Sequence, residues 1–126
     1  MKIMKKILIV DDEIEVASIF ETALKIAGYN VKIAPDGKSG IDMAKSEPFD
    51  LILLDQMLPD ISGNEILKRL KTDANLKNLP IALLTNFGHD TSVKEALLAG
   101  ANDYILKYQI SNDDLVAKVK KLFGEI

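Results

Sequence analysis

The chain has 126 residues, of which 48% are hydrophobic, and its sixteen basic and nineteen acidic residues leave a formal net charge of −3. This composition is typical of one soluble globular domain, and because the charges are interspersed rather than gathered in a basic block, it argues against direct nucleic-acid binding. The absence of cysteine excludes disulfides and thiolate metal sites, and no segment approaches the ~18 apolar residues of a membrane span, so we expect a single cytoplasmic domain over residues 1–126.

Five short apolar segments predict the strands of a sheet. In chain order they cover residues 7–10, 31–34, 51–54, 81–84 and 104–106. The first, third and fourth are apolar at every position, which is expected of parallel strands that are covered on both faces. The second alternates apolar and polar residues, which favours an edge strand.

Helical patterns fill the intervals between these segments. The predicted helices cover residues 16–27 and about 37–46, 63–72, 90–99 and 111–124. Gly28 and Gly100 are expected just beyond two helix ends, and Ser62 and Ser111 are expected as N-caps. Alternating strands and helices predict an α/β fold of five βα units, with a parallel sheet, right-handed crossovers and helices on both faces.

Polar residues follow four of the five predicted strands. Asp11 and Asp12 follow the first strand, Asp55 the third, Thr85 the fourth and Lys107 the fifth. Open parallel sheets bind ligands at the carboxyl ends of their strands. If the first, third and fourth strands are neighbours, these side chains converge at one edge.

Each of these residues also has a simpler structural explanation. Asp11 or Asp12 could cap the next helix, and Asp55 could open a turn. Thr85 could be one more strand residue, and Lys107 an ordinary solvated lysine. Taken singly, each simpler explanation is the stronger one; taken together, the five residues favour a shared site.

The acidic residues predict a magnesium site. Three carboxylates at one edge repel one another without a cation, and the lack of cysteine and of a nearby histidine argues against zinc or copper. Oxygen ligands suit Mg²⁺. We therefore expect Asp11, Asp12 and Asp55 to titrate together without Mg²⁺, with at least one pKa raised.

Phosphoryl transfer is the chemistry that this set of groups favours. A carboxylate beside a metal, such as Asp55, can attack phosphorus and form an acyl phosphate. Lys107 and the Thr85 hydroxyl could then compensate the charge of the transferred group.

Four motifs resemble the response regulator receiver domain of two-component signalling. They are VDDE at 10–13, LLDQMLPDISG at 53–63, LLTN at 83–86 and DYILK at 103–107. The resemblance covers essentially the whole chain. It implies a flavodoxin-like, three-layer fold with strand order 2-1-3-4-5.

The resemblance also implies roles for the acidic residues. Asp55 matches the aspartate that accepts the phosphoryl group. Asp11 and Asp12 match the acid pair that binds Mg²⁺, with Asp11 acting partly through water. Met57 matches the residue whose backbone carbonyl completes the metal site.

Three further residues match the family's switch. Thr85 corresponds to the hydroxyl that turns toward the phosphoryl group, and Lys107 to the lysine that pairs with it. Tyr104 corresponds to the aromatic side chain that swings inward when the hydroxyl moves. A strand aromatic packed on the last helix is the alternative interpretation of Tyr104.

The sequence departs from the family at two positions. Tyr108 replaces the usual proline after the lysine, and because a non-proline cis bond costs ~3 kcal/mol, we expect a trans bond there. Asn86 replaces a smaller residue after the threonine and is expected to narrow access to the phosphoryl group. His89, the only histidine, is expected to have no special role.

The resemblance implies a receiver that takes a phosphoryl group from a sensor histidine kinase or a histidine phosphotransfer protein. It would lose that group slowly, without being an enzyme in the usual sense, and would act on a downstream protein through its fourth helix, fifth strand and fifth helix. We expect no output domain in this chain, no direct contact with nucleic acid or membrane, and a monomer or a phosphorylation-linked homodimer.

Four alternatives remain open from the sequence. The chain could be a receiver-like binding module that works without phosphorylation, or the receiver part of a larger regulator. A metal-dependent phosphohydrolase is weaker, because such enzymes commonly carry a D-x-D pair after their first strand. A flavin-binding protein is weaker still, because the acidic loop would repel the FMN phosphate.

Overall fold

The computed structural model describes residues 4–86, 88 and 90–125. Within them, five parallel strands form one sheet in the order β2-β1-β3-β4-β5. The strands are β1 (Lys6–Val10), β2 (Asn30–Ala34), β3 (Leu51–Asp55), β4 (Ile81–Thr85) and β5 (Asp103–Leu106). The helices are α1 (Ile14–Ile26), α2 (Gly37–Ser46), α3 (Gly63–Lys71), α4 (Thr91–Leu98) and α5 (Asn112–Leu122). The predicted fold class and strand order are confirmed.

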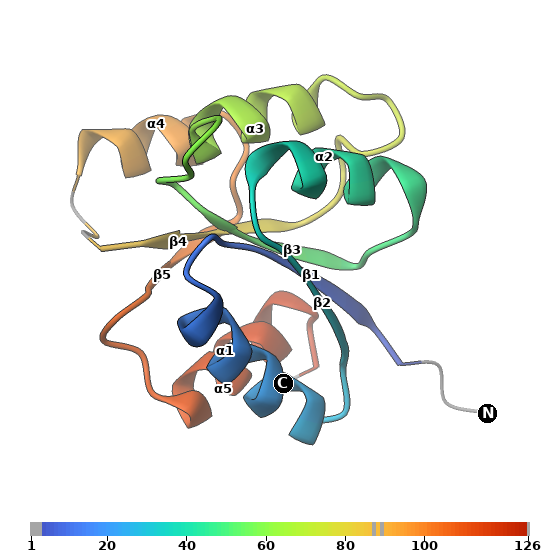
Figure 1. The fold of residues 1–126 in the computed structure, drawn as a ribbon, viewed down its shortest axis with the longest axis vertical. Coiled ribbons are helices and arrows are strands. Elements are labelled where there is room, and N and C mark those ends of the chain that lie inside the picture. Colours follow the sequence, from blue (N-terminus) through green and yellow to red (C-terminus); the bar gives the residue numbers. More distant parts are fainter. Residues whose placement is uncertain (1–3, 87, 89, 126) are drawn as a thin grey trace.

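The helices cover both faces of the sheet, which makes three layers. Helices α2, α3 and α4 lie on one face, and α1 and α5 lie on the other (Figure 1). In β1, Leu8 and Val10 point into the cluster that includes residues of α2, α3 and α4, whereas Ile7 and Ile9 point into the cluster that includes residues of α1 and α5. The central strands are apolar throughout because each face of the sheet has its own core.

The helix ends follow the predicted capping residues. Ser62 and Ser111 are N-caps, and each accepts a hydrogen bond from the backbone N–H three residues on, at 3.2 and 3.0 Å. Gly28 and Gly100 follow the C-caps of α1 and α4 with positive φ angles. Helices α3, α4 and α5 are slightly shorter than predicted because the predicted ranges included capping residues such as Asp90.

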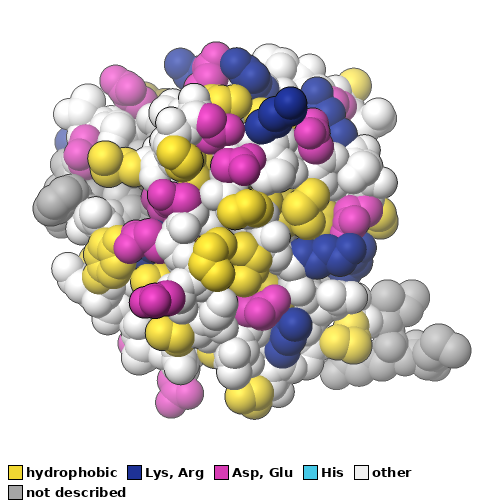
Figure 2. All heavy atoms as spheres, in the orientation of Figure 1, with side chains coloured by type: hydrophobic (Ala, Val, Ile, Leu, Met, Phe, Trp, Pro, Cys, Tyr) yellow, Lys and Arg dark blue, Asp and Glu magenta, His cyan; other side chains and the backbone are white. Residues whose placement is uncertain are grey.

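Strand β2 is an edge strand, as its alternating sequence predicted. Val31 and Ala34 are buried, whereas Lys32 is exposed and lies 2.9 Å from a carboxylate oxygen of Glu47. On the face of the molecule shown in Figure 2, acidic and basic side chains are interspersed with apolar ones. None of the helices in the described ranges is both long and apolar enough to cross a membrane.

Candidate functional site

The strand register brings the predicted site residues to one edge of the sheet. Asp11, the residue after β1, is level with Asp55, the last residue of β3. Thr85 lies one residue beyond the position opposite Asp55, and Lys107 lies one residue beyond the position opposite Thr85. These residues therefore converge although the sequence spreads them over almost the whole chain.

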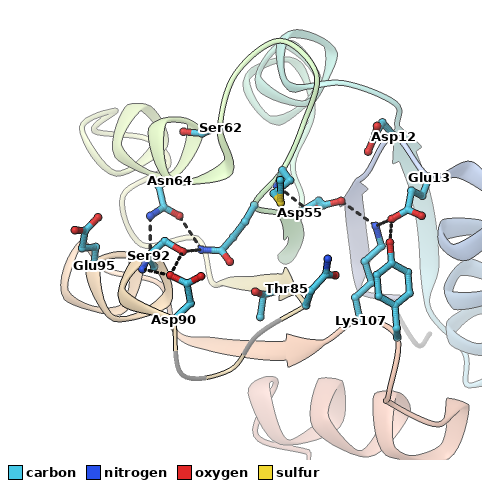
Figure 3. A pocket seen from close by; sticks show the side chains of 14 residues that line it. Asp12, Glu13, Asp55, Ser62, Asn64, Thr85, Asp90, Ser92, Glu95 and Lys107 are labelled. Carbon is cyan, nitrogen blue, oxygen red and sulfur yellow. Dashed lines mark hydrogen bonds and ion pairs between the residues drawn. The ribbon is translucent and has the colours of Figure 1, made fainter.

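A cavity of about 590 Å³ opens at this edge. Asp12, Asp55, Thr85, Asn86 and Lys107 are among the residues that line it. Figure 3 shows Asp55, Thr85 and Lys107 around the cavity, with interactions that run from Asp55 through Lys107 to Glu13. The cavity thus joins a carboxylate, a hydroxyl and an ammonium group.

Lys107 is the cationic centre of the site. Its residue is 3% exposed, and its Nζ lies 2.9 Å from Asp11 Oδ1, 2.9 Å from Asp55 Oδ2 and 2.5 Å from Glu13 Oε1. Burial alone would lower the pKa of this ammonium, but the hydrogen bonds to Glu13, Asp55 and Asp11 outweigh burial and raise it. Lys107 is therefore charged, and its interpretation as an ordinary solvated lysine is wrong.

Asp11 is fully buried beside this lysine. Its Oδ1 accepts hydrogen bonds from Lys107 and from the Glu13 backbone N–H, both at 2.9 Å. Burial raises the pKa of Asp11 to about 6, although the hydrogen bond from Lys107 acts in the opposite direction. This direction agrees with the predicted rise in at least one carboxylate pKa, and the joint titration of the three carboxylates stays a prediction. Helix α1 begins after Glu13, so neither Asp11 nor Asp12 is its N-cap.

The second oxygen of Asp11 fits a bound cation. Asp11 Oδ2 is buried and has no hydrogen-bond partner among the residues that the structure describes. One oxygen each from Asp11, Asp12 and Asp55 lie within 4.8 Å of one another. A buried oxygen without a donor is costly, and hard carboxylate oxygens are the ligands that Mg²⁺ prefers. The residues present therefore fit the predicted magnesium ion.

Met57 lies at the mouth of this group. Its backbone N–H donates to Asp55 Oδ1 at 3.0 Å, and its residue lines the cavity with 76% of its surface exposed. The two oxygens of Asp55 are thus held separately, Oδ1 by Met57 and Oδ2 by Lys107. The role of the Met57 carbonyl as a metal ligand stays a prediction.

Thr85 and Tyr104 lie on neighbouring strands, β4 and β5. Thr85 is buried and lines the cavity. The partly buried Tyr104 packs against the core on the side of α2, α3 and α4, rather than in the cluster of α5. A Cβ on Gly88, in the connection between β4 and α4, would lie 2.9 Å from the ring atom Cε2 of Tyr104. Tyr104 is therefore in close contact with the segment that follows Thr85.

Sequence reasoning gave no role to the pair formed by Glu13 and Tyr108. The Tyr108 hydroxyl donates to the same Glu13 oxygen that accepts from Lys107. The Lys107–Tyr108 peptide bond is trans, as predicted. Asn86 lines the cavity, as its predicted effect on access requires. His89 lies outside the described residues.

A second set of polar residues was also missed. The Gln56 side-chain amide donates to Asn64 Oδ1 and to Ser92 Oγ, both at 3.2 Å, and the Asn64 amide donates to the Ser92 backbone carbonyl at 2.9 Å. Ser92 Oγ in turn donates to Asp90 at 3.0 Å. We call Gln56, Asn64 and Ser92 the polar bridge, since it joins the segment after Asp55 to the first turns of α3 and α4. In the sequence, only the position of Gln56 directly after Asp55 indicated the polar bridge.

The connection between β3 and α3 is closely packed. The Gly63 backbone N–H donates to the Gln56 carbonyl at 2.9 Å. A Cβ on Gly63 would lie 2.7 Å from the Cα of Gln56 and would also contact the backbone carbonyl oxygen of Asp55. Only glycine allows α3 to begin this close to Asp55.

Comparisons with known proteins give one consistent result. The family model of the response regulator receiver domain matches residues 7–120. The phosphate regulon transcriptional regulatory protein PhoB of Pseudomonas aeruginosa is 40% identical over 116 residues, which cover 92% of this chain and 50% of that protein. The chain spans about half the length of the curated relatives it matches.

Solved structures give the same result. The chemotaxis response regulator CheY4 of Vibrio cholerae superposes with a TM-score of 0.90 at 28% identity, over 95% of this chain and 99% of that one. A CheY-like response regulator receiver domain protein from Methanospirillum hungatei has a TM-score of 0.88 at 31% identity, over 98% of this chain and 97% of that one.

Proposed function

The chain belongs to the response regulator receiver family of two-component signalling, and we propose that Asp55 is its phosphoryl acceptor in a Mg²⁺-dependent reaction. The observation that carries the proposal is the position of Asp55. It lies 2.9 Å from Lys107 and is grouped with the Asp11 oxygen that has no hydrogen-bond partner in the described part of the chain. This arrangement combines a nucleophile, a fixed positive charge and a cation site, which phosphoryl transfer requires.

The proposed donor is a phosphohistidine of a sensor kinase or of a phosphotransfer protein. A carboxylate oxygen of Asp55 forms the new bond to phosphorus, the bond from phosphorus to the histidine nitrogen breaks, and the imidazole leaves with the electron pair and takes up a proton. Asp11, Asp12 and Asp55 would hold the Mg²⁺, with the Met57 carbonyl as a further ligand. Bound there, the ion neutralises charge on the transferring group.

Lys107 and Thr85 stabilise the product in this proposal. The Lys107 ammonium, already 2.9 Å from Asp55 Oδ2, donates to an oxygen of the attached phosphoryl group. The Thr85 hydroxyl donates to another. Movement of Thr85 leaves space into which Tyr104 turns, and this changes the surface formed by α4, β5 and α5.

The partners follow from the same proposal. A histidine kinase or phosphotransfer protein supplies the phosphoryl group in the cytoplasm, and a downstream protein recognises the changed surface. The receiver acts as a monomer or as a phosphorylation-linked homodimer, and it shows only slow self-catalysed phosphorylation and dephosphorylation. Because the chain spans about half the length of its curated relatives, a receiver within a larger regulator is the second form of the proposal.

Intact-mass measurement after incubation with Mg²⁺ and acetyl phosphate tests the proposal. We expect the mass increase of one phosphoryl group in the parent protein, no increase in Asp55→Asn, and no increase in EDTA. Because Asn86 lines the cavity and is expected to narrow access for small donors, a phosphorylated histidine kinase is the second donor. Failure with both donors contradicts the proposal and favours a phosphorylation-independent binding module, whereas multiple turnover of a small phosphoester would favour a hydrolase.

A further inference from the structure

Glu13 and Tyr108 form a contact at the mouth of the cavity that the proposed chemistry does not use. Both residues line the cavity, and the Tyr108 hydroxyl donates to Glu13 Oε1. The same oxygen lies 2.5 Å from Lys107 Nζ. The ammonium also lies 5.4 Å from the centre of the Tyr108 ring. Tyr108 therefore acts on both members of the Glu13–Lys107 ion pair.

The hydrogen-bonding capacity of Lys107 is fully used in this arrangement. An ammonium group has three N–H donors, and Lys107 contacts three carboxylates, those of Asp11, Glu13 and Asp55. A phosphoryl oxygen on Asp55 can bind Lys107 only if one of these acceptors is displaced. Glu13 gains nothing from phosphorylation and would face the new negative charge across the lysine.

The two carboxylates other than Asp55 differ in their freedom to move. Asp11 is fully buried and is also held by a backbone N–H. The Glu13 side chain is 45% exposed, so water can solvate its carboxylate after it leaves Lys107. The Glu13 carboxylate accepts hydrogen bonds from both the Lys107 ammonium and the Tyr108 hydroxyl. Glu13 is therefore the acceptor that a phosphoryl oxygen could displace, and Tyr108 keeps it in place.

Resting on the proposed function, we propose that Tyr108 is a positioning residue that holds Glu13 on Lys107, where Glu13 competes with the phosphoryl group for the ammonium. The pair weakens binding of a phosphoryl group at Asp55 and shortens the lifetime of the acyl phosphate. Tyr108 acts through Glu13 and has no contact with the phosphoryl group in this proposal.

Beryllofluoride affinity at saturating Mg²⁺, followed by amide NMR shifts, measures the competition without turnover. Tyr108→Phe keeps the ring and removes the hydroxyl, and we expect about fivefold tighter binding, the effect of losing one exposed hydrogen bond to a charged group. Glu13→Gln is expected to tighten binding about tenfold or more, the effect of losing a hydrogen bond between two charged groups. Both variants should lengthen the acyl-phosphate half-life by similar factors.

Two control variants separate this effect from general ones. Tyr29→Phe removes a hydroxyl that donates to Glu125 elsewhere in the fold, and it should leave the affinity unchanged. Glu15→Gln removes an exposed carboxylate from the first turn of α1, the helix that begins after Glu13. It therefore measures the general effect of one negative charge on beryllofluoride affinity. The Glu13→Gln effect should exceed that of Glu15→Gln.

The double variant Glu13→Gln/Tyr108→Phe tests whether Tyr108 acts through Glu13 or independently of it. If Tyr108 acts through Glu13, removing its hydroxyl has no effect on affinity once Glu13 is neutral. The unfolding free energies of the same four proteins in EDTA should show the same coupling without any ligand. An unchanged affinity in Tyr108→Phe, or the same effect of Tyr108→Phe with and without Glu13, overturns the inference.

The parent protein and Asp55→Asn distinguish this result from failure of the proposed function. If the parent does not bind beryllofluoride, or if Asp55→Asn binds it equally well, the phosphoryl acceptor is wrong and the inference fails with it. If the parent binds normally and only the Tyr108 and Glu13 effects are missing, the proposed function stands without the inference.

Discussion

Lys107 and Asp55 are joined by a 2.9 Å ion pair across the end of one intervening strand, β4, although 52 positions separate them in the chain. The pair is buried, and a buried charge is tolerated only while it is paired with an opposite charge. One ammonium here serves three carboxylates. The balance of charge in the cavity, rather than any single contact, decides how the site responds to substitution.

Replacing Lys107 by methionine should destabilise the protein strongly in EDTA. Loss of the ammonium leaves Asp11 and Asp55 buried without a cation, which costs about 3–5 kcal/mol of unfolding free energy when a buried pair is broken. Addition of Mg²⁺ should restore part of this loss. Urea unfolding with and without Mg²⁺ measures both effects.

Lys118→Met is the matched control for that substitution. Lys118 pairs with Asp103 at 3.4 Å, and both side chains are about one-third exposed. A surface pair of this kind contributes at most about 1 kcal/mol. Equal destabilisation by the two lysine variants would contradict the central role of Lys107.

The pH dependence of the unfolding free energy should show the titration of Asp11. Its pKa is about 6 in the folded protein against a reference of 3.8, so the folded state binds the proton more tightly. Between these two pH values the free energy of unfolding therefore falls as the pH rises. The comparison to make is between the parent and Asp11→Asn in EDTA, because the other carboxylates titrate in both proteins.

We expect the stability of the parent to fall relative to that of Asp11→Asn from pH 4 to pH 6, by a total on the order of 2–3 kcal/mol. Saturating Mg²⁺ should reduce the fall, because the cation binds the ionised form. Parallel curves for the two proteins in EDTA would show that Asp11 ionises as easily in the folded chain as in the unfolded one.

Gly63→Ala should disturb the site, whereas the neighbouring Ser62→Ala should not. The added methyl group must displace the backbone at Asp55 and Gln56, so we expect weaker Mg²⁺ binding and a loss of stability of about 1–3 kcal/mol. Ser62→Ala removes the N-cap acceptor of α3 and should cost about 1 kcal/mol with unchanged Mg²⁺ affinity. Isothermal titration with Mg²⁺ distinguishes the two variants. Equal Mg²⁺ affinities would contradict the claim that the close packing of Gly63 against Asp55 shapes the site.

Asn64→Ala should loosen the first turn of α4 by breaking the polar bridge. Its amide donates to the Ser92 carbonyl, and its Oδ1 accepts from Gln56. We expect the α4 amides to exchange hydrogen about fivefold faster, as the loss of about 1 kcal/mol of local stability implies. Lys68→Ala, at an exposed position of α3, the helix that contains Asn64, is the control. Unchanged exchange in Asn64→Ala would mean that apolar packing alone holds α4.

The sequence was sufficient for the fold and for the residues at the strand ends. Uninterrupted apolar runs, such as the one before Asp11, require two covered faces, and the polar residue that ends each run follows from the same pattern. The contact of Glu13 with Tyr108 was not predictable, because 95 positions separate the two residues and their meeting depends on the path of the chain after β5. The polar bridge likewise depends on where α4 lies relative to α3.

The edge strand β2 has a consequence for how two copies of this protein could meet. Its exposed Lys32 pairs with Glu47 beside the open hydrogen-bonding groups of the strand. A charged lysine on an edge strand opposes the addition of a further strand, since its charge would be desolvated there. Continuous β-pairing between copies, the route by which many sheets aggregate, is therefore disfavoured at the β2 edge of the sheet.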